Sequence, residues 1–232
     1  TWADWEPREG EFDIERLEKR NNIALWKESG KHAVIRFVCD YPGVVDHMDI
    51  PQWLYDKTGD GTVYYRQFGR GYSPDYSNET FIEYHRKAIE ALAEYCNRDH
   101  FVSFVELGSI GHWGEWHAST GEGRNLMPDE AVCLEYASHY SDSFVNAILL
   151  TRRNYRFAAD GNMGFFNDMV GEEEDTREWL DWLENGGTQE TSGQPLELKP
   201  VNGFGRLQPI GGEFTSARSM NSMLGDGIGQ VL

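Results

Sequence analysis

Strand-like and helix-like segments alternate along the chain, and this alternation restricts the possible folds more than any other feature. Short apolar segments rich in β-branched and aromatic residues predict strands at residues 32–38, 101–107, 146–151, 163–169 and 206–214. Helical periodicity predicts helices at residues 13–29, 78–96, 128–144 and 172–186. Such alternation is typical of parallel strands joined by helical crossovers, so the sequence predicts an α/β protein.

Two parallel-sheet architectures fit this order, a doubly wound sheet and a (β/α)8 barrel. The apolar segments do not alternate strictly, which suits strands covered on both faces. No GxGxxG or Walker sequence follows any predicted strand, which disfavours the nucleotide-binding form. Polar and aromatic residues gather directly after the predicted strands, at Asp40, 106–117, Arg152–Arg153, Asn167–Asp168 and Glu213. In a barrel these positions converge on the face that carries the active site.

Charge and composition exclude several classes of partner. With 21 basic and 39 acidic residues among 232, the net charge is −18, which disfavours nucleic acid and anionic membranes and favours a neutral substrate. No apolar run is long enough for a transmembrane helix. The three cysteines are widely spaced and predict neither a disulfide framework nor a CxxC metal site. The sequence predicts a single domain over residues 1–232, with loops at residues 39–77 and 187–199.

The stretch VELGSIGHWGEWH, Val105–His117, carries the densest chemistry in the chain. Its glycines let the backbone bend and approach a ligand closely. Glu106 and Glu115 are candidate catalytic carboxylates, although Glu106 also suits a buried, paired support at the strand end. A metal site on His112, Glu115 and His117 is a further alternative. The Gly and Trp content argues against the helical His pair that zinc peptidases use.

Two further motifs lie near predicted strand ends or chain turns. Glu213 follows two glycines in RLQPIGGEF, on the same predicted rim as Glu115. Two carboxylates on one rim suit glycoside hydrolysis, in which one acts as an acid and the other as a nucleophile or base. In WADWEPREGEFD, Trp2 and Trp5 are either core residues or platforms for sugar rings, and Glu6 is expected to position the turn before Pro7.

These motifs resemble those of clan A glycoside hydrolases, which are (β/α)8 barrels. WADWEPREGEFD, followed by a helix and GKHAVIRF, is similar to a segment shared by clan A enzymes, and IPQWL is similar to a loop of the β-galactosidase-like members. YSPDYSN, VELGSIGHWGEWH, FFNDM and GGEF together resemble bacterial glycosidase-like barrel domains.

The resemblance implies a TIM-type barrel that is incomplete at both ends, from the exit of the second strand to past the seventh. It also implies that Glu213 is the nucleophile and that Glu115 or Glu106 is the acid/base. The sequence departs from the clan pattern here, because Val105 and Gly114, and not Asn, precede these two glutamates.

The sequence therefore predicts a retaining glycosidase for β-linked neutral sugars, with Glu115 and Glu213 as catalytic residues and Glu106 in support. The alternatives are a non-catalytic carbohydrate-binding or structural barrel and a metal-dependent hydrolase. No cofactor and no metal are expected, and a secreted or periplasmic location is favoured. The predicted substrate-binding residues are Trp5, Arg36, Asp40, His112, Trp113, Trp116, His117, Asn167 and Asp168.

Overall fold

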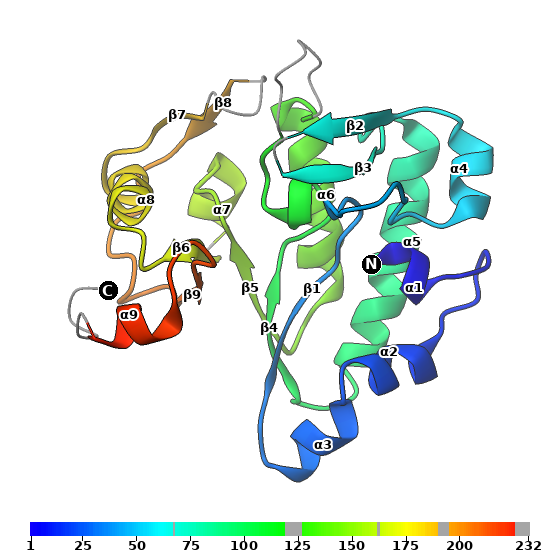
Figure 1. The fold of residues 1–232 in the computed structure, drawn as a ribbon, viewed down its shortest axis with the longest axis horizontal. Helices are drawn as coiled ribbons and strands as arrows, with labels where there is room; N and C mark the ends of the chain where they lie inside the picture. The colour runs from blue at the N-terminus through cyan, green and yellow to red at the C-terminus, as the bar shows by residue number, and fades with distance from the viewer. Residues whose placement is uncertain (67, 119–126, 162, 190–194, 226–232) are drawn as a thin grey trace. The chain divides into compact units, whose positions relative to one another are not determined.

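The chain divides into two compact units in the structure, which is a computed structural model (Figure 1). It describes residues 1–66, 68–118, 127–161, 163–189 and 195–225. Unit 1 is Thr1–Leu149 with Glu190–Pro195, and unit 2 is Leu150–Gln189 with Leu196–Leu232. The prediction of a single domain stays a prediction, and each unit is described by itself below.

A five-stranded parallel sheet confirms the α/β fold class. Its strands are β1 (Ala33–Arg36), β4 (Val102–Glu106), β5 (Ile148–Thr151), β6 (Gly164–Val170) and β9 (Ile210–Phe214). They follow one another in the order β1-β4-β5-β6-β9. The pairs β1–β4, β5–β6 and β6–β9 are parallel, and helices occupy the connections. Because each strand adds next to its predecessor, this is the strand order of an incomplete (β/α)8 barrel.

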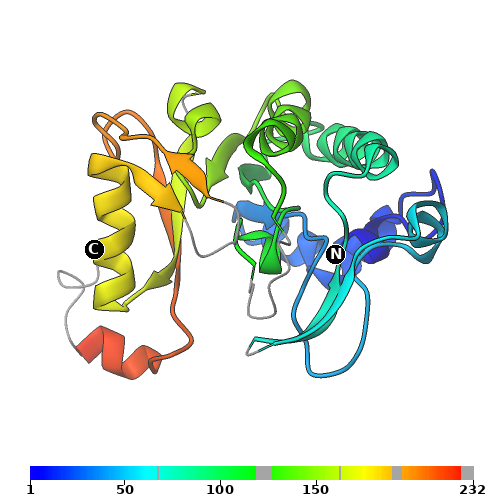
Figure 2. The same ribbon diagram turned by 90° about the horizontal axis from the view of Figure 1, so that it is seen from above.

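Two long helices of unit 1 begin close to where the sequence predicts them. Helix α5 (Glu79–Cys96) is capped by Asn78, whose side chain accepts a hydrogen bond from the Phe81 N–H. Helix α6 (Glu130–Ser143) is capped by Asp129 and begins two residues later than predicted. The two helices pack side by side (Figure 2). The apolar stripe of α5 is buried, as its 3.6-residue periodicity predicts.

The helix predicted over residues 13–29 is instead two short helices, α2 (Ile14–Arg20) and α3 (Ile23–Glu28). Asp13 caps the first, as predicted, by accepting from the Arg16 N–H. The break falls at Asn22, whose φ of 51° lies in the left-handed region. Asn adopts this conformation more readily than most residues, so it ends one helix and starts the next.

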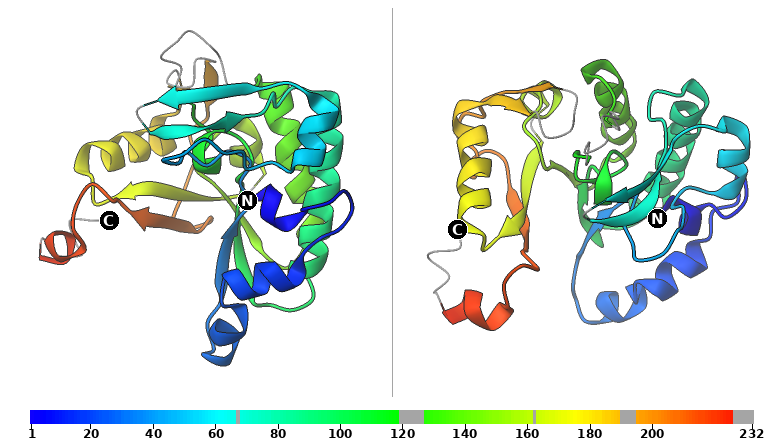
Figure 3. Two further views of the ribbon diagram at one scale, coloured as in Figure 1. Left: turned by 45° about the vertical axis from the view of Figure 1, so that its right-hand side comes forward. Right: turned by 45° about the horizontal axis from the view of Figure 1, so that its top comes forward.

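Both connections predicted as loops contain regular structure, so these predictions are wrong. Residues 39–77 form helix α4 (Gln52–Thr58) and an antiparallel hairpin of β2 (Thr62–Arg66) and β3 (Gly69–Ser73), visible in Figure 3. The segment 187–199 contains a second antiparallel hairpin, of β7 (Gly187–Gln189) and β8 (Leu196–Leu198). The Gly, Asp and Tyr content of residues 39–77 conceals the alternation that strands require.

The core of unit 1 gathers around the first helix, α1 (Trp2–Trp5). Trp2 is fully buried and packs against Phe37 and Phe81, with ring centroids 5.6 and 5.2 Å away. Its indole N–H donates to Glu6 at 2.8 Å. Glu6 also accepts from the Gly10 N–H, and burial raises the pKa of its carboxyl. Glu6 therefore holds the turn before Pro7, as the sequence predicts.

In unit 2, one helix packs on β6. Helix α8 (Glu173–Asn185) packs on β6 and buries Trp179 and Leu183. The sequence did not predict the short helix α7 (Arg156–Asp160), and a further short helix, α9 (Met220–Gly225), follows β9. Within the described ranges of both units, we find no helix with the length and apolar character needed to cross a bilayer.

Candidate active site

The stretch that follows β4 folds back on itself instead of leaving the strand end. The His112 N–H donates to the His117 carbonyl at 2.9 Å, and the Trp116 N–H donates to the Ile110 carbonyl at 3.1 Å. Five residues have φ between 54° and 79°: Ser109, Gly111, Trp113, Gly114 and Trp116. Three of these are not glycine, and such conformations persist only where tertiary contacts hold them. The loop is therefore a held structure, with its two ends close together.

A glycine lets this loop lie directly on the end of β1. A Cβ on Gly108 would come within 2.0 Å of the Phe37 carbonyl oxygen. The next residue, Ser109, donates its N–H to that same oxygen at 2.6 Å. Only a residue without a side chain fits this approach. Gly114 then packs over Gly108, where an added Cβ would lie 2.8 Å from the Gly108 Cα.

The folded loop brings Glu115 back beside Glu106 on a shared guanidinium. The strand register places Arg36 of β1 opposite Glu106 of β4. Arg36 contacts Glu106 Oε2 through Nε and Nη2, both at 2.7 Å. Arg36 Nη1 donates to Glu115 Oε1 at 3.3 Å, and His117 Nε2 lies 3.1 Å from Glu115 Oε2. We call Arg36, Glu106, Glu115 and His117 the carboxylate cluster.

The carboxylate cluster combines charge in a way that suits proton transfer. Within the cluster, one guanidinium contacts two carboxylates, and one of these carboxylates also contacts an imidazole. Glu106 takes two of the shorter contacts from Arg36, whereas Glu115 takes one longer contact and pairs with an imidazole. The side chains of Glu106 and Glu115 are 9% and 12% exposed, which limits solvent screening. Of the two carboxylates, Glu115 is the one that contacts an imidazole, a side chain that can exchange a proton near neutral pH.

A second buried group lies behind the loop and fixes its geometry. His112 Nδ1 lies 3.0 Å from Asp40 Oδ2, and the Tyr64 hydroxyl donates to Asp40 Oδ1 at 2.5 Å. The Trp113 N–H donates to the Asp40 carbonyl at 2.8 Å. All three side chains are buried, and the contact with Asp40 orients the His112 ring. Burial and the charge of Asp40 raise the pKa of the Tyr64 hydroxyl, so it stays a donor.

The predicted tryptophan platforms differ in accessibility. Trp116 is fully buried and donates its indole N–H to the Leu107 carbonyl at 2.6 Å. Trp5 is 3% exposed and stacks on Phe12. These two rings are core residues in this structure and present no open face to a sugar. Trp113 is half-buried, and its ring lies 5.3 Å from the exposed Phe68.

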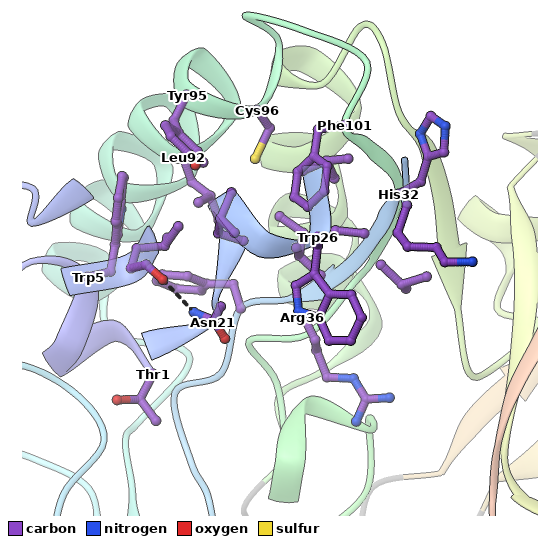
Figure 4. A pocket seen from close by; sticks show the side chains of 18 residues that line it. Thr1, Trp5, Asn21, Trp26, His32, Arg36, Leu92, Tyr95, Cys96 and Phe101 are labelled. Atoms are coloured by element: carbon purple, nitrogen blue, oxygen red, sulfur yellow. Dashed lines mark hydrogen bonds between the residues drawn. The ribbon is translucent and has the colours of Figure 1, made fainter. Parts of the chain in front are cut away.

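A separate pocket of unit 1 lies beside β1 (Figure 4). Its described lining is mostly apolar and includes Trp26, Leu92 and Phe101. Two predicted site residues, Trp5 and Arg36, also line it, with the Arg36 side chain at one end. Glu106 and Glu115 are not among these described lining residues, so this pocket is distinct from the face that presents the two carboxylates.

Unit 2 carries the remaining predicted site residues. Asn167 is buried on β6, where it donates to the Thr176 hydroxyl at 3.1 Å and accepts from the Met169 N–H at 3.0 Å. Both bonds are local, so Asn167 supports the exit of β6. Asp168 pairs with Arg152, with 2.5 Å between Nε and Oδ1. Glu213 is exposed on β9, next to Gly212, which pairs with Asn167.

Sequence reasoning missed two residues that the structure places at the site, Tyr64 and Phe68. Tyr64 lies on β2, and Phe68 lies between β2 and β3. Phe68 contacts the rings of His112 and His117, with centroids 6.3 and 6.0 Å away. The short β-branched and aromatic stretch TVYY, residues 62–65, was the available sequence signal for the first strand of the hairpin.

Comparison with known proteins gives a distant likeness of fold. No family model matches the chain, and no curated protein matches it. Similar solved structures are complexes of endo-glycoceramidase II from Rhodococcus sp., one of them a lactosyl-enzyme intermediate. The isofagomine complex aligns at a TM-score of 0.48 and 12% identity, over 97% of this chain and 51% of that one. The lactosyl-enzyme intermediate gives 0.46 and 12%, over 78% and 50%. The chain thus spans about half the length of the structures it matches, and at these scores the likeness carries no argument for function.

Proposed function

We propose that this chain is part of a retaining glycoside hydrolase that acts on β-linked neutral sugars. The observation that carries the proposal is the return of Glu115 to the strand end, where it shares Arg36 with Glu106 and contacts His117. Glu213, directly after the paired glycines of β9, supplies the second carboxylate. Glu115 follows the end of β4, and Glu213 is the last residue but one of β9; barrel enzymes hold their catalytic groups at such carboxyl ends of parallel strands.

In this mechanism Glu213 attacks the anomeric carbon, and a covalent glycosyl-enzyme forms as the leaving group departs. Glu115 protonates the leaving oxygen, then takes a proton from the water that releases the sugar. His117 and Arg36 hold the Glu115 carboxyl through both steps. Glu106 neutralises Arg36, and Trp113 offers a half-buried ring face to the sugar. Trp5 and Trp116 serve the fold instead, because they are buried.

Substitutions of Glu115 and Glu213 test their roles, because the effect of each should depend differently on the leaving group of the substrate. Glu115→Gln should slow the hydrolysis of alkyl β-glycosides by roughly a hundredfold to ten-thousandfold, because general acid catalysis contributes that much. It should slow dinitrophenyl glycosides far less, because that leaving group needs no proton. Glu213→Gln should abolish cleavage of both. Proton NMR of the first-formed sugar should show the β anomer, and the two carboxyl groups should lie about 5–5.5 Å apart in a crystal structure.

The control is Glu94→Gln on the exposed face of α5, which should keep full activity and the same melting temperature. Full cleavage by both site variants would exclude these assignments. The alternative is a non-catalytic carbohydrate-binding barrel, which the shared guanidinium also suits. In that case no β-glycoside is cleaved, while sugar binding persists and weakens in Arg36→Met. A metal assay on the purified protein tests the third interpretation, the metal-dependent hydrolase.

A further inference from the structure

Unit 2 buries an arginine that has unused hydrogen-bond donors. Arg153 follows β5 by two residues and is 4% exposed. Its guanidinium carbon lies 4.2 Å from the centre of the Trp182 ring on α8. In the part of the chain that the structure describes, its Nε and Nη1 are buried and have no hydrogen-bond partner. The ring covers one face of the guanidinium and leaves the donors in the guanidinium plane.

The charges around Arg153 do not compensate it. Its sequence neighbour Arg152 is also cationic, and the nearby carboxylate of Asp168 is already paired with Arg152 at 2.5 Å. Burial, and after it the charge on Arg152, lower the pKa of the Arg153 guanidinium to about 9, although the carboxylates of Asp168 and Glu178 act in the opposite direction. Arg153 is therefore still a cation at neutral pH. No ion pair joins Arg153 to a carboxylate among the described residues, and a buried cation without a direct partner is costly, so a protein rarely keeps one without a use.

The position of Arg153 also points to a ligand. It comes directly after the carboxyl end of a parallel strand, where α/β proteins bind their ligands. The local backbone is well held: Asn154 donates to the carbonyls of Trp182 and Lys199, and the Trp179 indole donates to the Arg152 carbonyl. The guanidinium is thus presented from a fixed frame, which lowers the ordering cost of binding.

We propose that Arg153, with Arg152 beside it, forms a binding site for a small oxyanion, the carboxylate, sulfate or phosphate group of a ligand. Guanidinium donors match such groups in geometry and charge. Stacking on Trp182 fixes the orientation of the guanidinium and leaves its N–H donors, which lie in the guanidinium plane, for the ligand. The proposal does not rest on the proposed glycosidase activity, because it uses none of the residues of the carboxylate cluster and its test requires no turnover.

Calorimetric titration of the whole chain tests the site directly. Sodium sulfate, phosphate and glucuronate are titrated at constant ionic strength, with glucose as the neutral control. At least one of the three oxyanions should bind saturably, and the preferred one identifies the source of the group. Arg153→Gln should weaken that binding about tenfold or more, because a charge-assisted hydrogen bond is lost. The matched control is Arg156→Gln, which removes an exposed arginine that pairs with Glu197 and should bind as the wild type does.

Melting temperatures distinguish an oxyanion site from a second possibility, in which Arg153 is structural and its N–H groups donate to buried water. Without oxyanion, Arg153→Gln should melt at the wild-type temperature or above it, since it removes an uncompensated buried charge. At saturating oxyanion the wild type should melt higher. Arg153→Lys, which keeps the charge, should retain part of the binding and serves if the Gln variant does not fold. The proposal is overturned if none of the three oxyanions binds the wild type saturably, or if Arg153→Gln binds as tightly as the wild type.

Discussion

At the scale of single residues, a buried chain of polar groups supports the loop from behind. The Ser109 hydroxyl lies 2.6 Å from His85 Nε2 and 2.5 Å from the Tyr140 hydroxyl. His85 Nδ1 faces His139 Nδ1 at 2.7 Å, so only one of these nitrogens carries a proton. Both rings are fully buried. Ser109 keeps its left-handed backbone because its side chain is tied to this network.

This histidine pair predicts a specific loss of stability in acid. Burial lowers the pKa of His139 to about 4 and that of His85 well below its ordinary value. Between pH 6.5 and 4 the unfolded chain binds protons that the folded chain refuses. The stability from neutral His139 is complete above pH 6.5 and falls by about 2 to 3 kcal/mol toward pH 4. Urea titrations across this range should show a smaller loss for His139→Asn, whereas the exposed His100→Asn should follow the wild type. Equal slopes for all three proteins would contradict this account.

At the scale of elements, the close contact between the end of β1 and the loop after β4 predicts the cost of one methyl group. Gly108→Ala places a Cβ 2.0 Å from the Phe37 carbonyl, a backbone atom that cannot swing aside. The variant should lose about 3 kcal/mol, at the upper end of overpacking costs. Gly30→Ala is the control: it meets no atom within 4 Å, and its φ of 65° costs about 1 kcal/mol. Equal losses in chemical denaturation would mean that the contact with β1 is not tight.

The sequence predicted the elements whose signals are local and missed those that depend on tertiary contacts. Helix α5 carries its own periodicity and cap, so its bounds were nearly right. The hairpin of β2 and β3 was missed because its strands are short and rich in Gly and Tyr. The left-handed backbone of Trp113 and Trp116 could not be predicted, because it depends on contacts within the fold. The Asp40 carbonyl accepts from the Trp113 N–H, and the Leu107 carbonyl accepts from the Trp116 indole.

The carboxylate cluster could be predicted from the sequence only in part. The pairing of Arg36 with Glu106 follows from the register of two parallel strands, and it could be anticipated once the strands were assigned. The position of Glu115 depends on the whole fold of the loop, which spacing alone did not determine. The burial of Trp5 and Trp116 could not be predicted either, because the sequence does not show whether a tryptophan packs in the core or lies on the surface.

At the scale of the whole molecule, the dominant property is the excess of acidic groups. The chain has 39 acidic and 21 basic residues, so many surface carboxylates outnumber their cationic neighbours. Exposed pairs such as Arg8–Glu11 and Lys87–Glu83 neutralise only part of this charge. Such pairs add little stability in water, whereas repulsion summed over a net charge of −18 opposes the compact state.

Salt should therefore stabilise this protein, contrary to the usual effect of weakening surface ion pairs. The screening length falls from about 30 Å at 0.01 M salt to about 8 Å at 0.15 M, which removes the long-range repulsion first. Scanning calorimetry in sodium chloride should show a melting temperature that rises by a few degrees over this range. Arg153→Gln should show the same rise, because screening needs no bound anion; a rise confined to the wild type would instead assign the effect to anion binding at Arg153. A melting temperature that falls with salt would mean that the surface pairs outweigh the net repulsion.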